Sequence, residues 1–377
     1  MKPGVLVVVG ALDGRGGLQN RWRRLATELA EDRAVTFLTW TPALWPSTST
    51  EGGYRVVRLP ALCGWDRDHS RPLEVINTAV TLLGGLVAAI VLQRRWRVAV
   101  GAGLHPEAVV AGLAARLLGR RFIAETWLVG PRGNVARLVR ARLSRPIVRL
   151  LSEASTVLTA SEEGAEELAS LGLDHDRIRR EVPAVEMERF APATIARRAV
   201  GRRAMGARRP HVLVYAGRFD LRQKRLDLLL EGWRRAEPKD WELVLVGQGA
   251  DEGTVRHMAS AAARVMVRPW TDDIATILAG ADAFALPTRF ESPGYALFEG
   301  MATGLPGLVS DIELYRQLRP DGVDLVAATP EAWTNALSRL AGAGAEELAR
   351  QGWAARQWIE AHLAPSYLRQ MEEILEG

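Results

Sequence analysis

The chain has 377 residues, of which 48% are apolar, so it is long enough to form two domains with a hydrophobic core in each. Its formal net charge is +5, and its single cysteine, Cys63, excludes an internal disulfide framework and favours a reducing, cytoplasmic compartment. The apolar run near the N-terminus is too short for a signal peptide. We therefore interpret residues 5–9 as a first buried strand.

The first half of the chain alternates predicted strands and helices. After the strand at 5–9 we expect a helix from Leu18 to about Glu31. Further strands are predicted at 34–40, 54–59, 98–100, 122–125 and 156–159. Such alternation predicts parallel strands joined by helices, in an α/β domain.

The segment 75–92 is apolar over about the minimum length of a transmembrane helix. Asn77, Thr78 and Thr81 interrupt it near its start, and a glycine pair follows. A transmembrane helix and a buried core helix both fit this pattern, and we favour the core helix.

The second half of the chain restarts the same alternation. Strands are predicted at 211–216, 241–246, 265–267, 283–286, 307–310 and 325–327. This predicts a second doubly wound parallel sheet, and ligands of such sheets bind at the carboxyl ends of the strands. We assign residues 1–190 to an N-terminal domain, 191–209 to an arginine-rich linker and 210–362 to a C-terminal domain.

The stretch 290–306 carries two glutamates, Glu291 and Glu299, with seven residues between them. Ser292-Pro293-Gly294 is typical of a helix start, so Glu291 precedes the helix and Glu299 lies within it. The first N–H groups of such a helix suit phosphate, whereas the two carboxylates suit sugar hydroxyls. The alternative interpretation is a capping acid at 291 and a solvated acid at 299.

A cluster of basic residues follows the strand at 211–216. Gly217 permits close approach of the backbone to a ligand. Arg218 presents a planar fork that grips phosphate, and Lys224 adds a compact positive charge. The alternative is that both are surface charges at the start of a helix.

Three blocks of the sequence carry a resemblance to a known family. The two glutamates resemble the Glu-x7-Glu signature of retaining glycosyltransferases of family 4. Tyr215-Ala-Gly-Arg218 with Lys224 is similar to the Gly-Arg…Lys block of that family, and Gly16-Gly17 is similar to its N-terminal glycine loop. The resemblance implies the GT-B architecture, in which two Rossmann-like, doubly wound domains face a central cleft. It also implies that the last helix, within 363–377, returns to the N-terminal, acceptor-binding domain.

The resemblance further implies a nucleotide-diphosphate sugar as donor. Arg218 and Lys224 would hold the leaving diphosphate without a metal, Glu299 would bind the ribose, and Glu291 would contact the donor sugar. The residues predicted to take part in catalysis are Glu291, Arg218, Lys224 and His105. The residues predicted to bind the nucleotide are Gly16, Gly17, Gly217, Gly247, Trp270, Gly294, Tyr295, Ala296, Leu297 and Glu299.

His105 lies just after the strand at 98–100 and is expected to face the acceptor, or to be a structural histidine. Many family members carry another histidine after the next strand, but Thr126-Trp127 stands at that place here. The usual glycine pair after the strand at 307–310 is likewise replaced, by Asp311-Ile312. Acceptor contacts from these two loops therefore cannot be carried over from the family.

We expect no bound metal. The runs 66–69 and 174–176 contain aspartate and histidine, but neither has a second cluster at a recognised ligand spacing, so solvated loops are the better interpretation. No nucleophile elbow and no G-x-G-x-x-G motif follows the first strand.

The charge is unevenly distributed. Residues 91–150 hold twelve arginines and two glutamates, a net charge of +10. Apolar residues at Val139, Leu143, Ile147 and Leu150 predict one helix with arginines on its other side. The helix is either an ordinary amphipathic helix or a dock for anionic lipid, with residues 94–97 as a second contact.

Together these features predict a retaining glycosyltransferase that moves a sugar to a hydroxyl acceptor, in the cytoplasm or peripherally at the inner face of the membrane. The acceptor could be a lipid-linked glycan, a polysaccharide or a small natural product. The alternatives are a same-fold enzyme that couples a different nucleophile and an inactive scaffold protein. Nucleic-acid binding has no recognised motif to support it, so we do not expect it.

Overall fold

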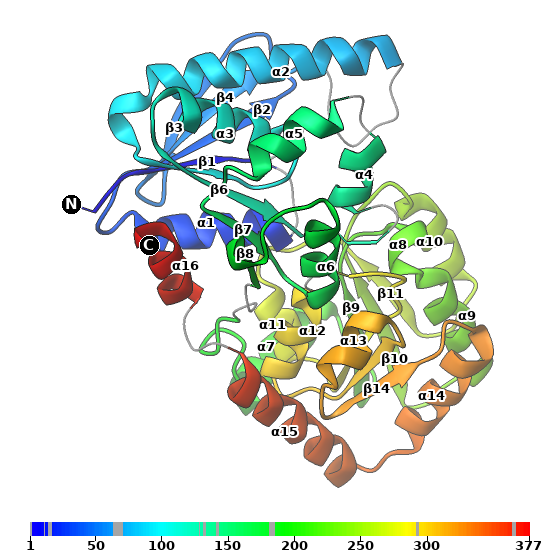
Figure 1. Cartoon of the computed structure of the whole chain (residues 1–377). Coiled ribbons are helices and arrows are strands. Elements are labelled where there is room, and N and C mark those ends of the chain that lie inside the picture. Colours follow the sequence, from blue (N-terminus) through cyan, green and yellow to red (C-terminus); the bar gives the residue numbers. More distant parts are fainter. Residues whose placement is uncertain are drawn as a thin grey trace. The chain divides into compact units, whose positions relative to one another are not determined.

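The computed structural model describes residues 2–10, 12–13, 17–62, 71–127, 129–130, 133–140, 143–180, 185–291, 294–363 and 367–377 (Figure 1). The chain forms two compact units. Unit 1 comprises Met1–Val182 and Ser366–Gly377, and unit 2 comprises Pro183–Pro365.

Unit 1 is built on an eight-stranded sheet with the order β3-β4-β2-β1-β5-β6-β7-β8. Its strands are β1 (Val5–Val8), β2 (Val35–Thr41), β3 (Ser47–Glu51), β4 (Tyr54–Pro60), β5 (Val98–Gly101), β6 (Arg121–Thr126), β7 (Thr156–Thr159) and β8 (Ile178–Arg180). All neighbours pair in parallel except β3, which pairs antiparallel with β4. The strand order reverses at β1, which lies between β2 and β5.

Helices cover both faces of this sheet. They are α1 (Gly17–Leu29), α2 (Arg71–Val91), η1 (Gln93–Arg95), α3 (Glu107–Leu117), α4 (Asn134–Arg140), α5 (Ser144–Leu151), α6 (Glu162–Ser170), η2 (His175–Arg177) and α16 (Tyr367–Glu376). Alternate residues of β1 enter two separate cores because successive side chains of a strand point to opposite faces. Leu6 and Val8 join the core that contains α3 and α5, whereas Val5 and Val7 join the core that contains α1 and α16.

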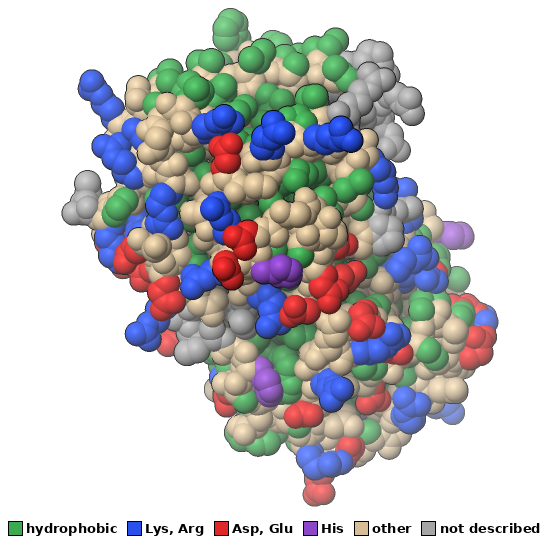
Figure 2. All heavy atoms as spheres, in the orientation of Figure 1, with side chains coloured by type: hydrophobic (Ala, Val, Ile, Leu, Met, Phe, Trp, Pro, Cys, Tyr) green, Lys and Arg blue, Asp and Glu red, His purple; other side chains and the backbone are tan. Residues whose placement is uncertain are grey.

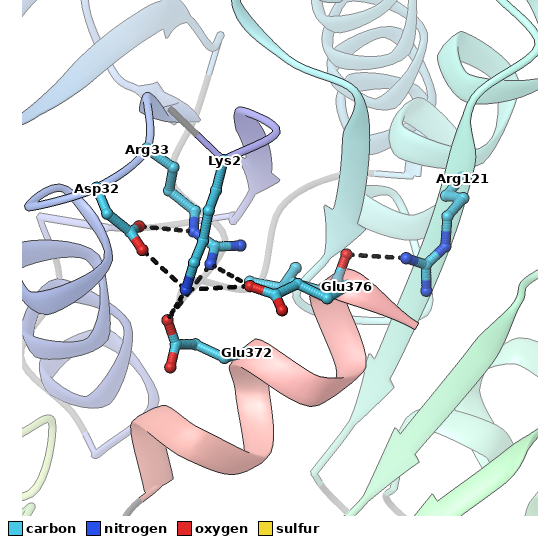
Figure 3. A network of polar contacts seen from close by, with 7 residues as sticks. Lys2, Asp32, Arg33, Arg121, Glu372 and Glu376 are labelled. Atoms are coloured by element: carbon cyan, nitrogen blue, oxygen red, sulfur yellow. Dashed lines mark hydrogen bonds and ion pairs between the residues drawn. The ribbon is translucent and has the colours of Figure 1, made fainter.

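The last helix, α16, packs on unit 1 although it follows unit 2 in the chain. Its Met371 and Leu375 are buried in the core with α1. Polar contacts surround that apolar face (Figure 3). Lys2 lies 2.6 Å from a carboxylate oxygen of Glu372, and Arg121 donates to the carbonyl oxygen of Leu375 at 2.8 Å. Arg121 therefore satisfies a carbonyl at the end of the helix, which lacks a partner within it.

Unit 2 is built on a six-stranded parallel sheet with the order β11-β10-β9-β12-β13-β14. Its strands are β9 (His211–Ala216), β10 (Trp241–Val246), β11 (Val265–Arg268), β12 (Ala283–Leu286), β13 (Gly307–Ser310) and β14 (Val323–Val326). Its helices are α7 (Ile195–Met205), α8 (Leu221–Lys224), α9 (Leu226–Ala236), α10 (Glu252–Ser260), α11 (Ile274–Ala279), α12 (Tyr295–Ala302), α13 (Glu313–Leu318), α14 (Pro330–Gly342) and α15 (Ala345–His362). Each face of the sheet has its own core, so the predicted fold class, two Rossmann-like α/β domains, is confirmed.

The segment predicted as a linker is structured and belongs to unit 2. Most of 191–209 forms α7, which begins after Thr194 and ends at Gly206, where φ is +70°. Arg198 and Arg202 of this helix both pair with Asp282, which precedes β12. The two units divide at 182/183, and these ion pairs lie within unit 2.

Two sequence expectations for unit 1 differ from the structure. The single helix expected across 139–150 is two helices, α4 and α5, and Val139 and Leu143 are exposed whereas Ile147 and Leu150 are buried. Within 94–97 the arginines are exposed but Trp96 is buried, so it cannot contact a lipid surface. Within the described ranges, none of the helices combines the length and apolar character that a membrane span requires.

Candidate functional site

In unit 2 the loops after β9 and β10 press against each other at the carboxyl edge of the sheet. The Gly217 N–H donates to the carbonyl oxygen of Val246 at 3.0 Å. A Cβ added to Gly247 would lie 2.0 Å from the Gly217 carbonyl oxygen. Glycine is therefore required at 247 for the two loops to meet, and both predicted loop glycines lie at this edge.

Helix α8 sets the positions of Arg218 and Lys224. Asp220 caps its first turn and accepts from the N–H groups of Arg222 and Gln223, each at 3.1 Å. Asp251 accepts from the Leu221 N–H at 2.7 Å, which ties the start of α8 to the segment before α10. Lys224 is the last residue of this short helix. Arg218 is exposed and lies in the loop before the helix begins.

Lys224 lies in the segment that follows β9, and Glu291 lies in the segment that follows β12. The two side chains form an ion pair. The Lys224 ammonium group contacts Glu291 Oε1, and the side chains are only 17% and 10% exposed. The prediction placed both residues around one ligand, and the structure brings them into direct contact. Salt screens a partly buried pair of this kind less than an exposed one.

Gln223 is a residue of this site that sequence reasoning missed. Its Oε1 accepts from Arg218 at 2.9 Å, and its Nε2 donates to the carbonyl oxygen of Phe290 at 3.2 Å. Its backbone carbonyl accepts from the Arg289 N–H at 2.8 Å. Gln223 therefore links the Arg218 loop to the segment that carries Glu291. The Asp220-x-x-Gln223 spacing resembles a capping box, and this pattern in the sequence could have pointed to Gln223.

The predicted helix start after Glu291 is present. Gly294 has φ +78° and precedes α12, and Ser292 and Pro293 lie outside the described residues. A Cβ on Gly294 would lie 3.0 Å from the Tyr315 hydroxyl. Burial, followed by the nearby Glu291 carboxylate, raises the pKa of Tyr315 well above its usual value, so its hydroxyl stays protonated.

The other residues predicted on α12 have different surroundings. Tyr295, Ala296 and Glu299 are half-buried. Leu297 is fully buried, and its N–H donates to the Gly294 carbonyl oxygen at 2.9 Å. Leu297 thus contributes to the core, and we do not carry it into the proposed donor site.

Trp270 lies after β11, at the same carboxyl edge of the sheet. It is half-buried, and its indole N–H donates to Asp272 Oδ1 at 3.1 Å. This bond orients the ring, and the contact with a nucleotide base stays a prediction.

In unit 1 the predicted glycine loop is described only in part. Gly16 lies outside the described residues, and Gly17 is the first residue of α1. His105 follows β5 and is exposed, although neighbouring atoms partly desolvate the imidazole and lower its pKa. Its role stays a prediction.

Glu107, which sequence reasoning missed, lies between the loops after β1 and β5. A Cβ on Gly10 would lie 2.5 Å from its Oε1, and one on Gly103 would lie 2.8 Å from its Oε2. A side chain at either glycine position would make this carboxyl group shift. Burial raises the pKa of Glu107 to about 7, so it titrates near neutral pH.

A second missed cluster lies where the family histidine is replaced. Glu125, at the end of β6, is fully buried and accepts from Arg21 at 3.1 Å. Trp22 and Trp127 each donate an indole N–H to Glu125 Oε2 at 3.0 Å. The Arg21 guanidinium also lies 3.9 Å from the Trp127 ring centroid. This cluster connects α1 to β6. Comparison of this position with the histidine of the family does not indicate a buried glutamate.

Among the residues that the structure describes, no group of three or more His, Cys, Asp or Glu side chains could hold a metal ion. The run 174–176 contains the N-cap and the first residues of η2, and Asp174 accepts from the Asp176 N–H at 3.1 Å. Cys63 and the run 66–69 lie outside the described residues. Asp311 and Glu313 flank the start of α13, and both pair with Arg316, so these acids have a structural role there.

Two family models match the chain, one on each unit. The family described as "Glycosyl transferase 4-like domain" matches residues 16–183, and the family described as "Glycosyl transferases group 1" matches residues 210–342. No curated protein matches the chain.

Solved structures are similar to the chain over its full length. HepE from Anabaena in complex with UDP and glucose shares 13% identity, with 100% of both chains covered and a TM-score of 0.78. Sucrose-phosphate synthase from Thermosynechococcus elongatus shares 18% identity, with 100% of this chain and 98% of that chain covered and a TM-score of 0.75. WaaG, a glycosyltransferase involved in lipopolysaccharide biosynthesis, shares 16% identity, with 99% and 100% covered and a TM-score of 0.73. These likenesses show the fold of the chain.

Proposed function

The chain is a glycosyltransferase with the two-domain GT-B fold, and on this premise we propose that it transfers a sugar from a nucleotide-diphosphate sugar to a hydroxyl acceptor with retention of configuration. The observation that carries the proposal is the contact between Lys224 and Glu291 beside Arg218, at the carboxyl edge of the unit 2 sheet. Ligands of doubly wound sheets bind at this edge. HepE binds UDP and UDP-glucose, which supports a nucleotide-sugar donor here.

The proposed roles follow from charge and position. Arg218 and Lys224 bind the diphosphate and neutralise the charge that develops on it as the glycosidic C–O bond breaks. Glu291, freed from Lys224 when phosphate takes its place, accepts hydrogen bonds from hydroxyls of the donor sugar. Glu299 binds the ribose. The acceptor oxygen attacks from the face that the diphosphate leaves, and its proton passes to the leaving phosphate.

We propose that these cations make a bound metal unnecessary for donor activation. One guanidinium and one ammonium group supply the positive charge that a divalent cation provides at other diphosphate sites. Transfer that depends on added Mg²⁺ or Mn²⁺, and that stops in EDTA, would contradict this part of the proposal.

We propose that the protein is cytoplasmic and works at an anionic membrane surface, where a lipid-linked glycan, a polysaccharide or a small natural product is the acceptor. The support is the +10 net charge of residues 91–150. Arg116, Arg137, Arg145 and Arg149 of this region are exposed in unit 1. Each basic residue near an anionic surface contributes on the order of 1 kcal/mol, screened within a Debye length.

Two other functions are weaker candidates. An inactive scaffold has no need of the Lys224–Glu291 pair or of the glycine contact at 247, both of which are present. An enzyme of the same fold with a different nucleophile would use the same donor site. Such an enzyme would be distinguished from the proposed one only by the product that it forms.

A thermal-shift screen against UDP-, GDP-, ADP- and TDP-sugars tests the proposal. A ligand that binds only the folded state raises the melting temperature, by an amount that grows with its concentration over Kd. We expect one base to stabilise the protein clearly more than the others. No shift with any of them would contradict the proposed donor class.

A further inference from the structure

Helix α2 turns most of its large apolar residues outward. The residues that it buries fully against the rest of unit 1 are small or polar, namely Asn77, Thr81, Gly85 and Ala89, each four positions after the last, whereas Leu82 and Leu86 are only partly buried against the core. A Cβ on Gly85 would lie 2.9 Å from the Trp40 ring, so a larger residue could not face inward there. The sequence predicted a buried core helix over 75–92, and this is wrong for its outer side. The large exposed residues of α2 are Val75, Ile76, Val80, Leu83, Val87 and Val91.

This apolar face is large and carries no charge. Leu83 is 67% exposed and Val87 is 61% exposed, and residues 75–91 contain no charged side chain. Leu62 lies near the start of this helix, since its N–H donates to Asn77 Oδ1 at 2.8 Å, and its side chain is 55% exposed. Figure 2 shows hydrophobic side chains gathered along the edge of the molecule where Figure 1 places α2. Exposed apolar surface of this extent marks a docking site.

Basic residues follow the apolar face directly. Arg94, Arg95 and Arg97 come just after α2 and are exposed, and none of them forms an ion pair with a residue in the described ranges. Arg120 holds this segment in place, since its guanidinium lies 4.5 Å from the Trp96 ring centroid and donates to the carbonyl oxygen of Gln93 at 2.6 Å. The contacts of Arg120 thus hold the segment 93–97, with its exposed arginines, in a defined position.

We propose that α2 is a membrane-docking helix that lies in the plane of an anionic bilayer surface. Its outer apolar residues enter the boundary between headgroups and acyl chains, and Arg94, Arg95 and Arg97 contact lipid phosphates. The helix lies on the membrane because its inner face packs on unit 1. A second copy of the chain is the less suitable occupant, because residues 75–91 offer no acidic group to pair with these arginines. The inference deepens the membrane contact proposed above by naming its surface.

Co-sedimentation with vesicles tests the inference. Vesicles of phosphatidylcholine, alone and mixed with phosphatidylglycerol, are compared at low and high salt. The variants are Leu83→Ser with Val87→Ser, and Arg94→Glu with Arg95→Glu. The matched control is Ile195→Ser in unit 2, because Ile195 is also highly exposed. A polarity-sensitive dye on Leu83→Cys, in a Cys63→Ser background, reports insertion, and the same dye on Trp353→Cys in unit 2 is its control.

We expect the wild type to bind the anionic vesicles and the Leu83/Val87 variant to bind roughly tenfold or more weakly. The Ile195 variant should bind like the wild type, and only the dye at 83 should shift to the blue. Unchanged binding of the Leu83/Val87 variant overturns the inference, even if the arginine variant loses binding. A wild-type dimer that this variant dissociates, seen by light scattering, also overturns it. Nucleotide-induced thermal shifts are followed in parallel, so a failed donor site is distinguished from a failed docking helix.

Discussion

Lys224 contacts Glu291, so the same ammonium group can exchange a carboxylate for a phosphate as the donor enters. Lys224→Ala and Arg218→Ala are each expected to lower turnover by roughly 3–4 kcal/mol of transition-state stabilisation, because each removes a preorganised positive charge. Steady-state kinetics measure this. Lys239→Ala is the control, since Lys239 is an exposed lysine of the same unit. Near-normal turnover in both site variants would show that these residues do not hold the diphosphate.

The two glutamates are expected to separate in their kinetic effects. Glu299→Ala should weaken binding of the free nucleoside diphosphate, because Glu299 is proposed to contact the ribose, which does not react. Glu291→Ala should mainly lower kcat, because Glu291 is proposed to contact the reacting sugar, and transition-state contacts appear in kcat. Calorimetry with the nucleoside diphosphate distinguishes the two. An equal loss of nucleotide affinity in both variants would argue against this division of roles.

Glu107 predicts a pH dependence of stability. Burial raises its pKa to about 7 from 4.5, so the folded state binds more protons than the unfolded state between these pH values. The stability that protonated Glu107 contributes is complete below the unfolded pKa and is lost as pH rises through about 7. Between about pH 5 and pH 8, the wild type should therefore lose up to about 3 kcal/mol relative to Glu107→Gln.

Urea unfolding at several pH values measures this difference. The exposed Glu31 provides the control, and Glu31→Gln should follow the wild-type pH curve. A constant difference between the wild type and Glu107→Gln across this range would mean that the carboxyl group titrates normally.

At the scale of elements, the contact between the loops after β9 and β10 leads to a prediction about glycine. Gly247→Ala should lower both the melting temperature and nucleotide affinity, because its Cβ would lie 2.0 Å from the Gly217 carbonyl oxygen. We expect a loss of about 1–3 kcal/mol in the free energy of unfolding. Gly253→Ala in α10 is a matched control, since nothing lies within 4 Å of its added Cβ, and it should be neutral or stabilising. Equal melting temperatures for the two variants would contradict the packing argument.

Elements with a strong local signal were predictable from the sequence. The buried strands β1, β9 and β10 are runs of apolar residues, and the start of α12 follows a glycine whose positive φ no other residue adopts easily. The ion pair of Lys224 and Glu291 could not be derived in the same way. It depends on the order of β9 and β12 in the sheet and on the contact of Leu221 with Asp251, which is distant in sequence.

Other elements were missed because tertiary contacts decide them. Strand β3 has the sequence STSTE, with no apolar residue, and it forms because it pairs with the edge of β4. In α2 the apolar residues lie on all sides, so hydrophobicity could not tell which face is buried. Gly85, which faces Trp40 and Val110, favours the observed orientation, and that contact is visible only in the folded chain.

At the scale of the whole molecule, the proposed chemistry places the attacking acceptor and the leaving diphosphate on one face of the sugar. A double displacement would instead need a carboxylate on the opposite face. Glu291 and Glu299 are the strongest candidates, but Glu291 contacts Lys224, which is proposed to bind phosphate, and Glu299 lies within α12, the helix that follows. Both are therefore expected on the side of the leaving group or at the ribose.

We accordingly predict that the product keeps the anomeric configuration of the donor and that no sugar becomes covalently attached to the enzyme. On the proposed roles, bond formation on the leaving face is favoured because Arg218 and Lys224 would stabilise the departing diphosphate there, and the diphosphate would accept the proton of the acceptor hydroxyl. NMR of the first product formed gives the anomer, and intact-protein mass spectrometry of enzyme quenched during turnover detects an adduct. The Glu291→Ala variant is the control for the second measurement, since any adduct on Glu291 would vanish in it. An inverted product, or a sugar attached to any side chain, would show that the reaction takes another course.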